Sequence, residues 1–147
     1  MGPAEVVERF LTDSEIPFTR SGQDRWIAQM RGERKLTIPM VLWLSGGVLR
    51  LESFFMRRPQ DNREKLYEIL LRRNLRAYTV RFALDRSGDV YLTGQIAMSA
   101  VTVEELDRVI GAVLVEADGM FDAAIEVGFE SYLARDLAWR RAGGAES

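Results

Sequence analysis

The sequence of 147 residues contains no cysteine and no histidine. The missing cysteines exclude disulfide bonds and thiolate nucleophiles. Without either residue type, the chain has no ligands for a Cys/His zinc site and no imidazole base. Carboxylate, lysine, serine and tyrosine side chains remain, but no phosphate-binding glycine loop or nucleophile elbow accompanies them. We therefore expect a protein that is not an enzyme and that uses no cofactor.

Long hydrophobic runs are also missing. The longest uncharged stretch, residues 36–49, is interrupted by Ser45, Gly46 and Gly47 and is too short to span a bilayer. The N-terminus has acids within its first ten residues and no apolar signal segment. These features predict a cytoplasmic protein with no membrane-spanning segment.

The residues that are present have the composition of one ordinary globular domain. Hydrophobic residues make up 47% of the chain and charged residues 29%, which is enough to form a single buried core. The net charge of −2 argues against a protein that coats DNA, because such a protein needs a strong basic excess. We expect one domain over residues 1–142, followed by a flexible tail over residues 143–147.

Hydrophobic periodicity predicts three helices and five strands. In chain order these are a helix to about residue 14, three strands within 24–56, a helix over 61–73, two strands within 78–98 and a helix from 102. In the fourth strand, alternation predicts that four side chains lie on the buried face: Tyr78, Val80, Phe82 and Leu84. Successive antiparallel strands with helices on one side predict an α+β domain with a five-stranded antiparallel sheet, in the order α-β-β-β-α-β-β-α.

Two capping boxes predict the starts of the later helices. Asp61 and Thr102 are each followed three residues later by a glutamate. The apolar stripe of the last helix continues through Gly119, so we expect this glycine to bend the helix rather than end it. A straight helix over 102–142 would be about 60 Å long. That length requires a bend or a partner in a domain of this size.

The second and third strands are apolar on both faces. Val41 and Trp43 lie on the side opposite the predicted core, and Phe54 and Met56 in the next strand share that side. A half-exposed strand should alternate apolar with polar residues. Leaving such a face in water forgoes about 1.5–3 kcal/mol for each large side chain. The cover is the long C-terminal helix, a second copy of the chain, or a peptide from a client.

A basic run follows the third strand. Residues 57–86 hold nine basic residues against four acids, whereas residues 102–138 hold nine acids against two arginines. The run has three interpretations: a solvated structural face, a rim that docks a protein, and a nucleic-acid surface. No helix-turn-helix or RNA-recognition signature accompanies it.

One cluster of acids is a rival candidate for chemistry. Glu116, Asp118 and Asp122 come close together in the last helix, and the two aspartates share a helical face. Oxygen ligands of this kind suit a hard cation. However, no spacing here matches an EF-hand loop, and acids on an exposed helix face are usually solvated. We therefore predict no metal site.

Four segments together resemble the YbjN-like family of bacterial proteins, in its actinobacterial members. They are LESFFMRRPQDNREKLYEILLRRN, VRFALDRSGDVYLTGQI, AVTVEELDRVIGAVLVEADGMFD and GFESYLARDLAWR, within residues 24–140. The family is related in fold to type III secretion chaperones, small α+β proteins that commonly dimerise and hold unfolded client segments. The resemblance implies the same element order. It also implies a stress or sensory regulator, but it identifies no site residue.

The leading hypothesis is a non-enzymatic, homodimeric, chaperone-like module that captures an apolar or amphipathic segment of an unidentified partner protein. Aliphatic and aromatic side chains would supply affinity, and arginines at the rim would set orientation. The expected partner-binding residues are Val41, Trp43, Phe54, Met56, Arg57, Arg58, Arg72 and Arg73. The alternative is a stress-response regulator that binds nucleic acid through the basic run 57–86. A carboxylate-metal enzyme is the third possibility.

Overall fold

The computed structural model describes residues 1–143 as a six-stranded antiparallel sheet with helices packed against it. The strands are β1 (Phe18–Arg20), β2 (Arg25–Met30), β3 (Ile38–Ser45), β4 (Val48–Met56), β5 (Arg81–Leu84) and β6 (Val90–Ala97). The helices are α1 (Pro3–Asp13), α2 (Arg63–Asn74), α3 (Val103–Gly128) and α4 (Glu130–Arg141), with a 3-10 helix η1 (Met98–Ala100) before α3. The strand order is β1-β2-β3-β4-β6-β5.

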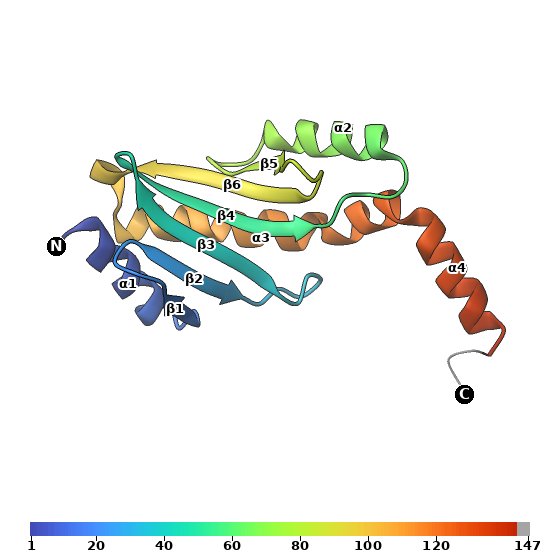
Figure 1. Ribbon diagram of the computed structural model, residues 1–147, viewed down its shortest axis with the longest axis horizontal. Helices are drawn as coiled ribbons and strands as arrows, with labels where there is room; N and C mark the ends of the chain where they lie inside the picture. Colours follow the sequence, from blue (N-terminus) through green and yellow to red (C-terminus); the bar gives the residue numbers. More distant parts are fainter. Residues whose placement is uncertain (144–147) are drawn as a thin grey trace.

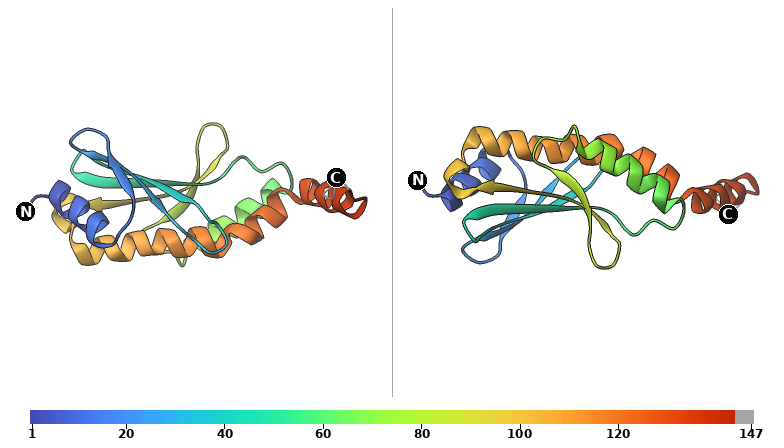
Figure 2. Two further views of the ribbon diagram at one scale, coloured as in Figure 1. Left: turned by 90° about the horizontal axis from the view of Figure 1, so that it is seen from below. Right: turned by 90° about the horizontal axis from the view of Figure 1, so that it is seen from above.

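Helices α1, α2 and α3 lie on one side of the sheet, and within residues 1–143 the opposite face carries no helix (Figures 1 and 2). The inner face follows the alternation of the sequence, because every second residue of each strand points toward α3. The large side chains fully buried there include Trp26, Met40, Leu42, Leu49, Leu51, Phe55, Leu92 and Leu106. The prediction of an α+β domain with helices gathered on one side is confirmed.

The predicted number of five strands is wrong, because β1 adds a sixth at the edge of the sheet. It is only three residues long and pairs with β2, with Phe18 opposite Ala28 and Arg20 opposite Trp26. Pro17 immediately precedes it, and so short a segment has no periodicity to detect. The sheet therefore ends in a short edge strand rather than in β2.

The predicted burial of Tyr78 and Leu84 is also wrong. These side chains are 44% and 49% exposed, whereas Val80 and Phe82 are buried as expected. Regular strand structure begins only at Arg81, because Thr79 has a left-handed backbone (φ 63°) that interrupts the alternation. Leu84 lies at the far end of this edge strand, next to the hairpin.

Of the two predicted capping boxes, only the N-cap hydrogen bond of Thr102 forms. The side chain of Thr102 accepts a hydrogen bond from the amide of Glu105 (3.1 Å) at the start of α3. Helix α2 instead begins after Asn62, which has a left-handed backbone and makes no side-chain cap. The Asp61 carboxylate accepts hydrogen bonds from the amide (3.0 Å) and hydroxyl (2.7 Å) of Ser131. It therefore caps the first turn of α4, not α2.

The long C-terminal helix is broken at Gly128, whereas Gly119, as expected, does not end it. Helix α3 runs without interruption through Gly119, and α4 follows after Phe129 and extends away from the body (Figure 1). The amides of Gln60 and Asp61 both donate to the Gly128 carbonyl (2.9 Å each). The loop before α2 thus fixes the break.

No helix within residues 1–143 is long and apolar enough to cross a membrane. The predicted flexible tail, residues 143–147, lies outside the described residues apart from Gly143.

Candidate functional site

The helix-free face of the sheet is the candidate site. Val41, Trp43 and Phe54 lie on it and are half-buried, and Ile27 is 48% exposed. Helix α3 packs against the inner face, so the expectation that the C-terminal helix covers Trp43 is not met (Figure 2). Within residues 1–143 no helix lies over this face.

Strand register places the side chains of the helix-free face in three rows. In the first row Trp43 lies between Arg25 and Arg50, its direct partners on the neighbouring strands. In the second row Val41 pairs with Ile27 on one side and with Glu52 on the other. The first row is therefore an indole flanked by two guanidinium groups.

The third row is aromatic. Phe54 lies opposite Tyr91 on β6, and their rings meet edge to face with centroids 5.5 Å apart. Burial raises the pKa of the Tyr91 hydroxyl, and the nearby carboxylates of Asp85, Asp89 and Glu52 add to the shift. This phenol therefore stays neutral and able to donate a hydrogen bond at neutral pH.

A hollow of about 310 Å³ lies between the first two rows. Its polar and aromatic lining comes from Trp43, Arg50, Glu52, Arg81, Thr93 and Gln95. The Arg81 guanidinium donates to the carbonyls of Ala77 (2.7 Å) and Val80 (2.9 Å), which holds it in place. The hollow thus has one fixed and one unrestrained arginine in its wall.

The first two rows of the helix-free face are basic although the whole chain is acidic. Their strands carry Arg25, Arg50 and Arg81 against the carboxylate of Glu52, whereas Asp85 and Asp89 lie near Tyr91 in the third row. Within the described residues neither Arg25 nor Arg50 has a carboxylate oxygen within 4.0 Å. Two guanidinium groups are thus available to a ligand.

Met56, predicted to lie beside Trp43, is instead in the core. A bulge between Phe54 and Met56 shifts the β4–β6 register by one residue, so the side chain turns inward. It is only 3% exposed and lies against Gly128 of α3. Simple alternation cannot reveal such a bulge.

The four predicted rim arginines lie beyond the end of β4 and on α2, not around Trp43. The Arg57 guanidinium lies 4.5 Å from the ring centre of Phe129, and Arg58 lies beside the β5–β6 turn, where its amide donates to Asp89. Arg72 pairs with Glu68 on its own helix, and Arg73 pairs with Glu116 of α3. The basic run is therefore dispersed among separate local contacts.

The sequence pattern did not identify the polar residues of this face as site residues. Six of them occupy outward positions of their strands, as alternation predicts: Arg25, Arg50, Glu52, Arg81, Thr93 and Gln95. What brings them together is the pairing of β4 with β6, because β6 follows β5 in the chain but lies between β4 and β5 in the sheet. That order is not encoded in local periodicity.

The three acids considered for a cation engage three different protein partners. Glu116 binds Arg73 (2.7 Å), and Asp122 pairs with Arg34 (3.7 Å). Asp118 accepts hydrogen bonds from the backbone amides of Arg34 (2.6 Å) and Lys35 (3.0 Å), which lower its pKa. Within residues 1–143 no group of three or more acids is placed to hold a metal ion.

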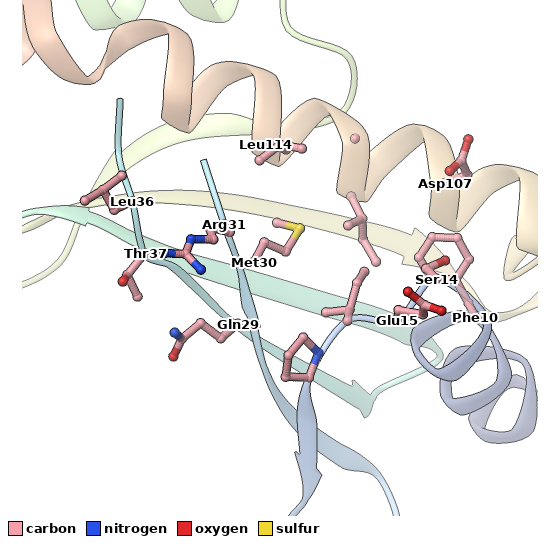
Figure 3. Close-up of a pocket in the computed structure, with 14 residues that line it drawn as sticks. Phe10, Ser14, Glu15, Gln29, Met30, Arg31, Leu36, Thr37, Asp107 and Leu114 are labelled. Carbon is pink, nitrogen blue, oxygen red and sulfur yellow. The ribbon is translucent and has the colours of Figure 1, made fainter. Parts of the chain in front are cut away.

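A second, apolar groove lies on the helix side of the sheet. It has a volume of about 820 Å³, and Phe10 of α1, Met30 of β2 and Leu114 of α3 point into it (Figure 3). Gly111 forms part of its wall, and a Cβ atom there would meet nothing within 4 Å. Its rim carries two acids, Glu15 and Asp107.

Comparison with known families decides the classification. The family model YbjN, described as "Putative bacterial sensory transduction regulator", matches residues 3–126. The chain belongs to the YbjN family. Helix α4, which begins at Glu130, lies outside the part of this YbjN protein that the family model matches.

Mycobacterial proteins are similar to this YbjN protein. The uncharacterized protein Rv0487 of Mycobacterium tuberculosis is 47% identical over 118 residues, which cover 80% of this chain and 64% of the relative. The uncharacterized protein ML2442 of Mycobacterium leprae is 35% identical over 130 residues, covering 88% and 71%. The chain thus spans about two thirds of the length of these relatives.

Solved structures share the fold at low sequence identity. A chain of the HopA1–SchA chaperone–effector complex matches with a TM-score of 0.58 and 18% identity, over 78% of this chain and 89% of that one. A chain of the ExsC–ExsE complex matches with a TM-score of 0.58 and 17% identity, over 83% and 96%. YbjN from E. coli matches with a TM-score of 0.51 and 18% identity, over 79% and 91%. The fold expected from the resemblance is confirmed.

Proposed function

We propose that this YbjN protein is a non-catalytic, chaperone-like binding module that captures an apolar or amphipathic segment of another protein on its helix-free face. The observation that carries the proposal is the half-buried set Val41, Trp43 and Phe54 on a face that no helix covers within residues 1–143. Contiguous apolar patches on the surface of a folded domain mark interaction sites. The fold shared with chains of chaperone–effector complexes supports the same class of activity.

The chemistry of the face suits protein binding better than catalysis. Aromatic and arginine side chains are the residues most enriched at the centres of protein interfaces. The face presents Trp43, Phe54 and Tyr91, and among residues 1–143 no group of three or more acids is placed to hold a metal ion. A partner segment gains affinity there by burying these rings.

The helix-side groove near Gly111 is the second candidate docking surface. A side chain that fills this groove distinguishes binding there from binding on the helix-free face. The Cβ atom of Gly111→Leu would meet nothing within 4 Å, and the residue lies in the wall of the groove with Leu114. Binding on the helix-free face survives this substitution. Binding in the groove does not.

We also propose that the module is a homodimer, in which α4 contributes to the contact. No residue of α4 is buried, and its exposed apolar side chains are Tyr132, Leu133, Leu137 and Trp139. A second copy would remove these side chains from water. Light scattering at micromolar concentration should give the dimer mass, and Leu137→Asp should shift it toward the monomer. A monomeric wild-type protein contradicts this part of the proposal.

The binding proposal is tested by affinity purification with three forms of the tagged protein. The wild type and Val115→Glu, a change on the exposed side of α3, should retain the same partner protein. Trp43→Glu should lose it while keeping the wild-type circular dichroism spectrum and melting temperature. If Trp43→Glu retains the partner and Gly111→Leu loses it, the helix-free face is not the site.

A further inference from the structure

The hollow beside Trp43 has the composition of an anion site. Arg50 and Arg81 both line it, and Thr93 and Gln95 add a hydroxyl and an amide as hydrogen-bond donors. Arg81 is held by two backbone carbonyls, whereas Arg50 has no acidic partner within 4.0 Å among the described residues. Guanidinium groups bind carboxylates with two parallel hydrogen bonds, which gives both affinity and orientation.

The charge around the hollow selects an acidic rather than a basic ligand. Arg25, on the far side of Trp43, adds a third positive charge to the same face. Glu52 supplies the carboxylate in the lining of the hollow, whereas Asp85 and Asp89 lie near Tyr91 in the third row. A basic group at the hollow would therefore face three arginines and gain one carboxylate. The acidic residues of α3 cannot neutralise the face, because α3 lies on the opposite side of the sheet (Figure 2).

We propose that this hollow takes the side-chain carboxylate of an aspartate or glutamate in the partner segment, and that apolar residues on either side of that acid pack on Trp43 and on the Phe54–Tyr91 pair. This inference rests on the proposed binding function and names the chemistry of the partner. It assigns two roles: Arg50 and Arg81 bind the acid, and the aromatic rings bind its neighbours.

The spacing of the rows defines the pattern of such a segment. Rows on one face of a strand are two residues apart, or about 7 Å. Trp43 is in the first row, the hollow reaches into the second, and Phe54 and Tyr91 form the third. An extended segment with an aromatic residue, an acid and an aromatic residue at every second position therefore matches the face.

A protein segment fits these observations better than single-stranded nucleic acid. A nucleic acid carries a phosphate at each nucleotide, and a continuous row of phosphates would run past the Glu52 carboxylate in the middle of the face. One side-chain carboxylate needs only the space between Arg50 and Arg81. The hollow of about 310 Å³ accommodates a group of that size.

The test uses labelled synthetic peptides in which phenylalanine and glutamate alternate, with a serine between each pair. A matched peptide has glutamine in place of glutamate, and a short oligothymidylate serves as a competing polyanion. Fluorescence anisotropy measures the dissociation constant for the full-length wild type, Arg50→Glu and Arg9→Glu. Arg9 is exposed on α1, so Arg9→Glu changes the net charge by the same amount away from the face.

We expect the glutamate peptide to bind the wild type and Arg9→Glu equally, within about twofold. The glutamine peptide, and the variant Arg50→Glu with the glutamate peptide, should each bind about tenfold more weakly, because each loses a charge-assisted hydrogen bond. Added salt should weaken only the binding of the glutamate peptide. If Arg50→Glu does not keep the wild-type melting temperature, Arg50→Gln replaces it with the same expected direction.

Three results would overturn the inference, and they separate it from the proposed function. Equal affinity for the glutamate and glutamine peptides, lost on Trp43→Glu, would leave apolar docking intact but remove the acid site. Binding of neither peptide would reject the stated pattern, while the partner purification with Trp43→Glu decides the function independently. Tighter, Arg50-dependent binding of the oligothymidylate at the same salt would assign the face to nucleic acid.

Discussion

Arg72 and Arg73 are adjacent in α2, yet they make different kinds of ion pair. Arg72 bonds Glu68 one turn earlier on the same exposed helix face (2.8 Å). Arg73 crosses to α3 and bonds Glu116 (2.7 Å), whose side chain is only 7% exposed. The hydrogen bond to Glu116 raises the pKa of Arg73, so the guanidinium stays charged at any accessible pH. Arg73 thus connects α2 to α3 through an ion pair and does not lie at a rim around Trp43.

This contrast predicts unequal effects on stability. Arg73→Met should lower the free energy of unfolding by about 2–4 kcal/mol, because it leaves the Glu116 carboxylate buried without a partner. Arg72→Met should change it by less than about 0.5 kcal/mol, the usual value of an exposed pair on one helix. Urea unfolding at pH 7 measures both. The double variant Arg73→Met with Glu116→Leu should recover most of the loss, and equal effects of the two single variants would contradict the assignment.

Asp118 holds the loop between β2 and β3 against α3. Its carboxylate accepts the amides of Arg34 and Lys35, and these hydrogen bonds keep its pKa below the ordinary value. A depressed pKa in the folded state gives stability that is fully present above the unfolded pKa of about 4 and is lost as the pH falls through the folded value. The stability that these hydrogen bonds contribute is therefore lost in acid.

The variant Asp118→Asn tests the linkage, because an amide keeps a hydrogen-bond acceptor but cannot titrate. The stability difference between the wild type and Asp118→Asn should be largest above pH 5 and should shrink between about pH 4 and pH 2. Urea midpoints across this range measure it. Asp122→Asn, which removes only an exposed partner of Arg34, is the control and should change little with pH. A constant difference for Asp118→Asn over the whole range would reject the cause.

At the scale of the element, the junction of α3 and α4 is set by a close approach at Gly128. A Cβ atom there would lie 3.1 Å from Leu66 and Pro59 and 3.2 Å from Met56, so three neighbours would have to yield together. A Cβ atom at Gly119 would meet nothing within 4 Å. Gly128 is therefore required by packing, whereas Gly119 is an exposed helical glycine.

These two glycines provide a matched pair. Gly128→Ala should destabilise the protein by about 1–2 kcal/mol through overpacking. Gly119→Ala should stabilise it by about 0.5–1 kcal/mol, because alanine is the better helix former. Thermal unfolding followed by circular dichroism distinguishes the two signs. Stabilisation by Gly128→Ala would show that the junction has room for a side chain.

Asp61 acts on α4 from a distant part of the sequence. Its bonds to Ser131 lower its pKa and satisfy the first turn of α4. Asp61→Ala should therefore speed amide hydrogen exchange in the first turn of α4 while the sheet strands keep their protection. Uniformly faster exchange, or no change in α4, would contradict this role.

Much of the element pattern could be predicted from the sequence, and the failures have specific physical causes. Strong periodicity located β2, β3, β4, β6 and α3, because each buries one face against the others. The bulge that turns Met56 inward and the loop that ends α3 at Gly128 depend on contacts between distant segments. Asp61 has the sequence signature of a cap for α2, but the folded chain uses it for α4. These are tertiary effects that no local pattern contains.

Only part of the candidate site could be predicted, because its residues come together through strand pairing. The excess of apolar residues on β3 and β4 located Trp43 and Phe54 on a second face that the long helix does not cover. The arginines that matter there, Arg25 and Arg50, are isolated in the sequence and meet only through strand pairing. The conspicuous basic run drew attention to Arg72 and Arg73 instead. Clustering in the sequence was a poor guide to clustering in space.

At the scale of the whole molecule, the protein has two distinct sides. Helices α1, α2 and α3 lie against the inner face of the sheet (Figure 2). The outer face presents aromatic rings among arginines. The YbjN family model covers residues 3–126, which include every strand of that face. Helix α4 adds a projecting element beyond the matched region. This division separates the proposed client surface from the proposed dimer contact.

The proposed function requires the helix-free face around Trp43 to contact the partner protein. Site-specific photo-crosslinking tests it most directly, with a photoreactive phenylalanine at position 43 and, as the control, at position 115 on the exposed side of α3. We expect a crosslinked partner from position 43 that is absent from position 115, and loss of that adduct on Phe54→Glu. Adducts from position 115 alone, or equally from both positions, would contradict it.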